Sequence, residues 1–111
     1  MVRVKFFRNE DDFLEGFEVK GHSGFANQGE DIVCAGVSAL TQGILTGLLE
    51  VVEAEIDWHK DEGRLFCRIT KDPEKRDIQV LLLTLYEALK KIALDYSDFV
   101  DIAEKGGAVK C

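Results

Sequence analysis

Apolar and polar residues alternate at the start of the chain. Val2, Val4 and Phe6 occupy every second position, which is the pattern of a half-buried β-strand. The polar run 9–12 indicates a turn, and a second strand is predicted over 13–20, so the two strands form a hairpin. The residues expected on one side of the second strand are Phe13, Phe17 and Val19.

From Asp31 onward the apolar residues recur every three or four positions, which predicts an amphipathic helix. Asp31 is expected at the N-cap or next to it. Gly36, Gly43 and Gly47 each weaken a helix by up to about 1 kcal/mol relative to alanine. We therefore expect another backbone, from the sheet or from a second subunit, to approach this helix closely. Its predicted apolar face consists of Val33, Val37, Leu40, Ile44, Leu48 and Val51.

The second half of the chain repeats the strand and helix patterns. Alternating residues over 54–58 and 65–69 flank an Asp-Glu-Gly turn and predict a second hairpin. Asp72 is expected to cap a second helix with Pro73 at its first position, and a short strand is predicted over 100–102. The apolar face of the second helix is expected to consist of Ile78, Leu81, Leu85, Leu89 and Ile92.

This order of elements, ββαββαβ, predicts an α+β fold with two layers, in which two helices pack on a mostly antiparallel sheet. A chain of 111 residues with no internal linker is expected to form one domain over 1–111. Only the first ββα half carries a glycine-rich loop followed by a cysteine. Chemistry is therefore expected in that half.

Carboxylates outnumber lysines and arginines by 21 to 14, which gives a net charge of -7. This charge opposes the binding of RNA or DNA, because such binding uses Lys and Arg to neutralise phosphates. We expect no direct contact with nucleic acid and favour a basic partner. The acidity also fits the simpler interpretation that surface charge keeps the protein soluble.

No apolar stretch was expected to reach the roughly 20 residues that cross a bilayer, and the N-terminal residues lack the apolar core of a signal peptide. We therefore expect a cytoplasmic protein without a membrane anchor. Cys34, Cys67 and Cys111 are far apart and odd in number, which predicts reduced thiols. No zinc-binding spacing is present, and no metal or other cofactor is expected.

The segment 21–40 brings a histidine and a cysteine together around a flexible loop. Cys34 lies near the predicted helix start, where unpaired backbone N–H groups lower the pKa of a thiol and can hold an oxyanion. His22 could then act as the base for this nucleophile. The simpler interpretation is that Cys34 is a small buried apolar residue and His22 a turn residue.

Other interpretations remain open at this point. Cys34 could be a redox sensor, or a metal ligand together with His22 and Asp31, although a fourth ligand is missing. Cys67 alternates with inward-facing residues and is expected in the core. His59 is expected to be an exposed residue at a strand edge.

The residues Gly-His-Ser-Gly-Phe-Ala at 21–26 and Asp-Ile-Val-Cys-Ala-Gly-Val-Ser-Ala-Leu at 31–40 resemble the signature of the Prp family of bacterial ribosomal-processing cysteine proteases. The resemblance extends over the whole chain. It implies an endopeptidase that removes a short N-terminal extension from large-subunit ribosomal protein twenty-seven. The implied substrate is a basic ribosomal protein with paired aromatics before the cleaved bond. The resemblance also implies a homodimer.

Carried over residue by residue, the family's nucleophile falls on Cys34 and its catalytic histidine on His22, with supporting residues at Asp31 and Ser38. Ser38 follows Cys34 by one helical turn and either donates a hydrogen bond or packs. Asp31 either orients His22 or caps the helix.

The loop around His22 is interpreted either as a lid that closes over substrate or as a static turn. Its substrate-contacting residues are predicted to be Gly21, Ser23, Gly24, Phe25 and Gly29. The alternative to a protease is a non-enzymatic, ribosome-associated assembly factor, which would need no thiol. RNA-binding modules carry basic stripes, and this acidic chain does not favour that alternative.

Overall fold

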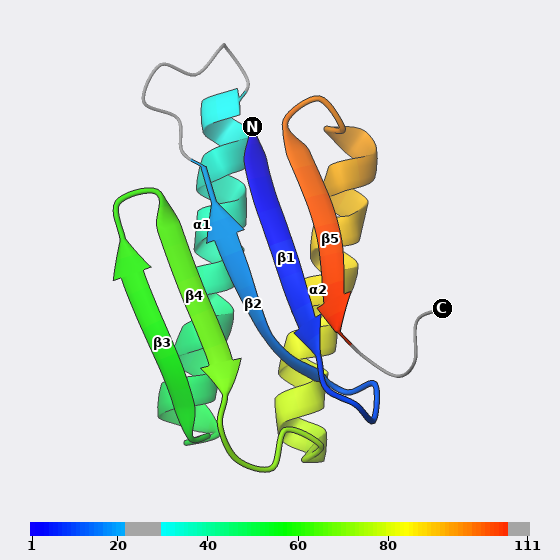
Figure 1. The fold of residues 1–111 in the computed structure, drawn as a ribbon. Coiled ribbons are helices and arrows are strands. Elements are labelled where there is room, and N and C mark those ends of the chain that lie inside the picture. Colours follow the sequence, from blue (N-terminus) through cyan, green and yellow to red (C-terminus); the bar gives the residue numbers. More distant parts are fainter. Residues whose placement is uncertain (22–29, 107–111) are drawn as a thin grey trace.

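The computed structural model of the chain describes residues 1–21 and 30–106, and for Glu30 and Asp31 the backbone alone. The elements follow in the predicted order ββαββαβ (Figure 1), which confirms the fold class. The five strands and two helices are β1 Val2–Arg8, β2 Leu14–Lys20, α1 Glu30–Thr46, β3 Ile56–Asp61, β4 Arg64–Ile69, α2 Arg76–Asp95 and β5 Val100–Gly106, and a π-helical segment Gly47–Val51 continues α1.

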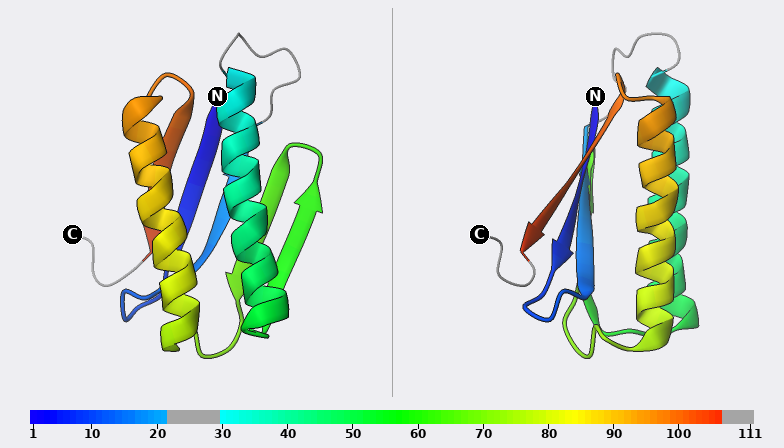
Figure 2. Two further views of the ribbon diagram at one scale, coloured as in Figure 1. Left: turned by 180° about the vertical axis from the view of Figure 1, so that it is seen from behind. Right: turned by 90° about the vertical axis from the view of Figure 1, so that its right-hand side faces the viewer.

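The five strands form one sheet in the order β3-β4-β2-β1-β5. Every neighbouring pair is antiparallel except β1 and β5, which run parallel with Val2 opposite Val100. Both helices cover the same face of the sheet and leave the other face open (Figure 2). The predicted two-layer, mostly antiparallel arrangement is therefore confirmed.

The core lies between the sheet and the two helices. Phe6 and Phe17 face each other there with ring centroids 6.5 Å apart, and the edge of Tyr86 contacts Phe6. Burial of such side chains is the main source of stability in a domain of this size. The other fully buried large side chains are Val2, Val4, Leu14, Val37, Leu48, Ile78, Leu82, Leu85 and Leu89.

The second strand begins one residue later than predicted. Phe13 lies outside β2 and is 39% exposed, whereas Leu14 is fully buried in its place. The cause is the turn before it, where the Asn9 side chain accepts hydrogen bonds from the N–H groups of Asp11 and Phe13. The pairing register also shifts after Phe7. The prediction that Phe13 belongs to this strand, on one side with Phe17 and Val19, was wrong.

The inward face of α1 and of the π-helical segment that continues it differs from the prediction at four positions. Leu40 and Val51 are exposed, whereas Thr41 and Leu45 are buried. Burial of Thr41 is possible because its hydroxyl donates a hydrogen bond to the carbonyl of Val37 at 2.9 Å. Thr41, a polar residue, therefore lies on the buried face where the apolar pattern predicted Leu40.

The helical glycines do not mark the approach of another part of this backbone. A side chain at Gly36 or Gly43 would meet no described atom within 4 Å. At Gly47 the neighbour is the Leu81 side chain, 3.2 Å from an ideal Cβ. The expected approach of the sheet was wrong, and that of a second subunit stays a prediction.

The second helix starts later than the sequence predicted. Lys75 is its N-cap, and α2 begins at Arg76. Asp72 has a left-handed backbone with φ of 51°, and its carbonyl accepts a hydrogen bond from the N–H of Lys75. Asp72 and Pro73 therefore belong to a turn before the helix. The buried face also includes Leu82, which the prediction missed, while Leu81 is only partly buried.

One helical run has the length and apolarity of a membrane span. Ile32–Val51 contains 20 residues and reaches a mean hydropathy of 1.8, so the prediction that no stretch approaches this length was wrong. Val33, Val37 and Leu48 of this run pack into the core of the domain. A core helix passes the same test, so composition alone does not place it in a membrane.

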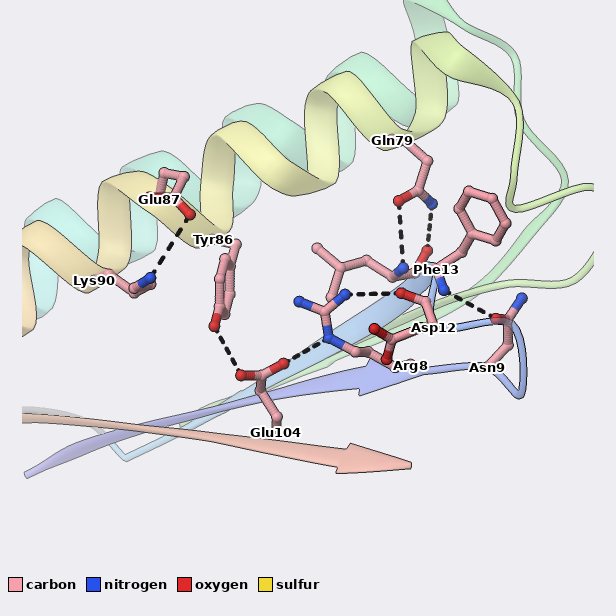
Figure 3. Close-up of polar contacts among 10 residues, drawn as sticks. Arg8, Asn9, Asp12, Phe13, Gln79, Tyr86, Glu87, Lys90 and Glu104 are labelled. Carbon is pink, nitrogen blue, oxygen red and sulfur yellow. Dashed lines mark hydrogen bonds and ion pairs between the residues drawn. The ribbon is translucent and has the colours of Figure 1, made fainter. Parts of the chain in front are cut away.

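The edge strand β5 is held to the rest of the fold by a polar cluster (Figure 3). Glu104 accepts a hydrogen bond from Nε of Arg8 on β1 at 2.6 Å and one from the hydroxyl of Tyr86 on α2 at 2.7 Å. The Arg8 guanidinium and Lys90 Nζ both lie over the Tyr86 ring. The Glu104 carboxylate thus joins β5 to β1 in the sheet and to α2 in the helical layer.

Tyr86→Phe is expected to lack the hydrogen bond to Glu104 at every pH, so that only the wild type loses this contribution at high pH. The hydrogen bond to Glu104 raises the pKa of Tyr86 above its ordinary value near 10. A raised pKa means that the contribution is complete below pH 10 and is lost as the pH rises through the folded value. The wild type should lose about 0.5–1.5 kcal/mol of stability over that range, and Tyr86→Phe should not. Urea unfolding of both proteins at pH 8 and 11 measures the two losses of stability. Equal losses in the wild type and in Tyr86→Phe would contradict the prediction.

Candidate active site

Cys34 lies on α1, near the point where that helix begins. Because α1 starts at Glu30, Cys34 is its fifth residue, and Asp31 lies in the first turn rather than at the cap. The unpaired amides of the first turn therefore precede Cys34. The electrostatic contribution of a helix end decreases beyond the first turn, so it is smaller at Cys34 than a cap at Asp31 would give.

The Cys34 side chain is partly exposed and lines a cavity of about 200 Å³. The cavity lies at the end of the molecule where α1 begins, β2 ends and the β3–β4 turn closes (Figure 1). One wall of the cavity is α1, and the opposite wall comes from the sheet. The lining residues are Val2, Val19, Gly21, Cys34, Val37, Ser38, Thr41, Gln42, Lys60, Asp61, Gly63, Arg64 and Leu65.

Backbone contacts shape the wall opposite Cys34. The N–H of Gly21 donates to the carbonyl of Gly63 at 3.0 Å and joins the end of β2 to the β3–β4 turn. Gly21 has φ of 103°, and a Cβ there would clash with the carbonyl oxygen of Met1. Glycine is therefore required at this position, which belongs to the predicted substrate loop.

The charged groups around the cavity are paired. Arg64 donates to Glu18 through Nη2 at 2.7 Å and through Nε at 2.8 Å. Asp61 contacts His59 Nε2 at 2.7 Å, and Lys60 Nζ donates to the amide oxygen of Gln42. Each of the three charged residues in the cavity lining therefore has a polar partner.

Of the predicted site residues, the structure brings Cys34, Ser38 and Gly21 to one cavity. Four other predicted residues, Ser23, Gly24, Phe25 and Gly29, lie outside the described residues, and so does His22. For Asp31 only the backbone is described. The roles assigned to these residues stay predictions.

Cys67 and His59 lie as predicted. Cys67 is fully buried, and desolvation raises its pKa to about 12, so it is unsuited to act as a nucleophile. His59 is exposed and pairs with Phe66, so it faces away from the helices. Among residues 1–21 and 30–106, no group of three or more His, Cys, Asp or Glu residues could hold a metal.

Sequence reasoning missed Gln42 and Lys60. Gln42 Nε2 donates to Ser38 Oγ at 2.6 Å, and this contact has the i,i+4 spacing of neighbours on one helical face. That spacing was visible in the sequence. The sequence did not indicate a contact for Lys60, because Lys60 on β3 meets Gln42 on α1 only in the folded structure.

Comparison with known proteins agrees with this geometry. The sequence model of the family described as cysteine protease Prp matches residues 1–101. The chain belongs to the Prp family of cysteine proteases. Family membership confirms the predicted protease and does not support the non-enzymatic assembly factor.

Two Prp relatives are similar over nearly their whole length. The ribosomal processing cysteine protease Prp of Bacillus subtilis strain 168 is 32% identical over 103 residues, which cover 88% of this chain and 92% of the relative. The protein of the same name from Staphylococcus aureus strain Mu50 is 26% identical over 106 residues, which cover 95% and 100%.

Solved Prp structures share the fold. The essential ribosomal processing protease Prp from S. aureus in complex with a substrate peptide has a TM-score of 0.87 at 24% identity, covering 95% of this chain and all of that one. The same protease with a covalently linked product peptide has a TM-score of 0.83 at 25% identity and the same coverage.

Proposed function

We propose that this protein is an endopeptidase that uses Cys34 as nucleophile and His22 as its base. The observation that carries the proposal is the position of Cys34, partly exposed in a cavity next to Ser38 at the beginning of α1, in a chain of the Prp family. A buried sulfur such as that of Cys67 could not meet a peptide. Cys34 can.

The reaction follows from these groups. The Cys34 thiolate attacks the carbonyl carbon of the scissile bond, and the resulting oxyanion is held by amides of the first turn of α1. Protonated His22 gives its proton to the leaving amine, which leaves a thioester on Cys34. Water then attacks the thioester with His22 as base, which releases the acid and restores the thiol. Ser38 donates a hydrogen bond in the cavity, and Asp31 orients His22.

The proposed substrate is large-subunit ribosomal protein twenty-seven with a short N-terminal extension. The names of the relatives from B. subtilis and S. aureus support ribosomal processing. The net charge of -7 favours a basic partner of this kind over nucleic acid. Ser23, Gly24, Phe25 and Gly29 are proposed to contact the peptide together with Gly21.

The protein is further proposed to act in the cytoplasm as a homodimer and to need no cofactor. Exposed apolar side chains on the helical side support self-association, since Ile32 and Leu94 are 77% and 81% exposed in the single chain. Removal of such residues from water is the usual source of stability in a homodimer.

A peptide assay tests the proposed substrate. A peptide that copies the extended N-terminus of the ribosomal protein from the same genome should be cut at one bond after its paired aromatics. A matched peptide with both aromatics replaced by alanine should be cut at least about tenfold more slowly, since each buried aromatic contributes well over 1 kcal/mol. Mass spectrometry of the products measures both. Equal cleavage of the two peptides, or cleavage of neither, would contradict the proposal.

A further inference from the structure

Ser38 is connected to the sheet by two hydrogen bonds in series. Gln42 Nε2 donates to Ser38 Oγ at 2.6 Å, and Lys60 Nζ on β3 donates to Gln42 Oε1 at 3.0 Å. All three residues line the cavity that contains Cys34. Ser38 and Gln42 are half-buried, so solvent competes with the bond between them only in part.

The chemistry of the donors fixes the direction of both bonds. The ammonium of Lys60 has three donors and no acceptor, so it must face the amide oxygen of Gln42. The amide NH₂ then faces Ser38 and, being a donor, makes Ser38 Oγ an acceptor. The hydroxyl hydrogen of Ser38 is left for a different partner. Within 1–21 and 30–106, no acceptor for it is found.

Cys34 is the thiol on the same helical face as Ser38. It precedes Ser38 by four residues, and side chains at this spacing lie on the same face of a helix about 5–6 Å apart at Cβ. Both side chains line the same cavity. A hydroxyl that already accepts a hydrogen bond is also the better donor, because hydrogen bonds in series polarise one another.

We propose that Gln42 and Lys60 are positioning residues that hold Ser38 as a hydrogen-bond donor to the thiolate of Cys34. The proposal rests on the proposed function, because it assumes that Cys34 works as a thiolate. Lys60 orients the amide, the amide orients the hydroxyl, and the hydroxyl stabilises the anion. Neither Gln42 nor Lys60 touches the reacting atoms.

Gln42→Glu reverses this arrangement with almost no change in shape. A carboxylate at position 42 still accepts from Lys60, but it cannot donate, so Ser38 must turn its hydrogen toward position 42. The apparent pKa of Cys34 should rise by about one unit, the value of one hydrogen bond to a charged group. The rate of iodoacetamide alkylation of Cys34, followed by peptide mass spectrometry between about pH 5 and 10, measures this pKa.

The Ser38→Ala variant separates the effect of the Ser38 hydrogen bond on Cys34 from the effect of the added carboxylate charge. Ser38→Ala alone should raise the apparent pKa of Cys34 by a similar amount, and adding Gln42→Glu to it should cause no further shift. A charge effect of the carboxylate would persist without Ser38. The remaining charged groups at the cavity, Asp61 and Arg64, are unchanged in every variant. A shift that persists in Ser38→Ala, or no shift in Gln42→Glu, would overturn the proposal.

Gln79→Glu is the matched control on the other helix. Gln79 Nε2 donates to the carbonyls of Leu14 and Pro73 at 2.6 and 2.7 Å, away from the cavity. This variant should lower the thermal midpoint and leave the alkylation profile of Cys34 unchanged. Alkylation requires no proteolysis, so it tests the hydrogen bond from Ser38 to Cys34 even if no peptide is cut. Absent cleavage by the wild type would instead reject the proposed function.

Discussion

Cys34→Ala is expected to abolish peptide cleavage, with kcat/KM falling by at least about 10³-fold. The variant keeps the helix and the cavity but removes the sulfur that is proposed to form the thioester. His22→Ala should have an effect of similar size, because neither the thiol nor the leaving amine would then have its proton carrier. Cleavage of the extended ribosomal peptide, followed by mass spectrometry, measures both variants.

Cys67→Ala is the control for the loss of a thiol. Cys67 is fully buried, so its replacement leaves a small cavity and lowers the free energy of unfolding by about 1–2 kcal/mol. Its kcat/KM should equal that of the wild type. Cys34→Ala should instead keep the free energy of unfolding of the wild type and lose kcat/KM, since Cys34 is partly exposed and little packing is lost. Retained cleavage in Cys34→Ala with an intact circular dichroism spectrum would reject Cys34 as the nucleophile.

Most of the fold could be predicted because most of its elements have one apolar face and one polar face. Leu65, Cys67 and Ile69 alternate in the sequence and are all buried in β4. The errors occur where a local contact overrides this pattern. Thr41 is buried because a carbonyl one turn earlier accepts its hydrogen, and the turn built by Asn9 delays β2. The spacing of apolar residues along the sequence does not reveal these local hydrogen bonds.

The candidate site could be predicted only in its local part. The spacing of Cys34 and Ser38 predicts that they share a helical face, and both do line one cavity. The Lys60 contact joins residues 18 positions apart and depends on how β3 lies against α1. A period of 3.6 residues cannot report such a contact.

Gly16→Ala is expected to cause a large loss of stability. Gly16 lies in β2, between Phe7 of β1 and Arg68 of β4. A Cβ at this position would clash with the carbonyl oxygen of Cys67 and lie 2.9 Å from Cα of Arg68. Both atoms belong to the backbone, so the methyl group can be accommodated only if β2 and β4 separate.

The expected loss is about 3 kcal/mol, a large part of the 5–15 kcal/mol that stabilises a typical domain. Gly43→Ala provides the matched comparison, because a Cβ there meets no described atom within 4 Å. That residue lies inside a helix, where alanine is better than glycine by up to about 1 kcal/mol. Urea unfolding followed by circular dichroism should therefore move in opposite directions for the two variants. A Gly16→Ala midpoint equal to that of the wild type would mean that β2 and β4 are not packed as closely as their pairing indicates.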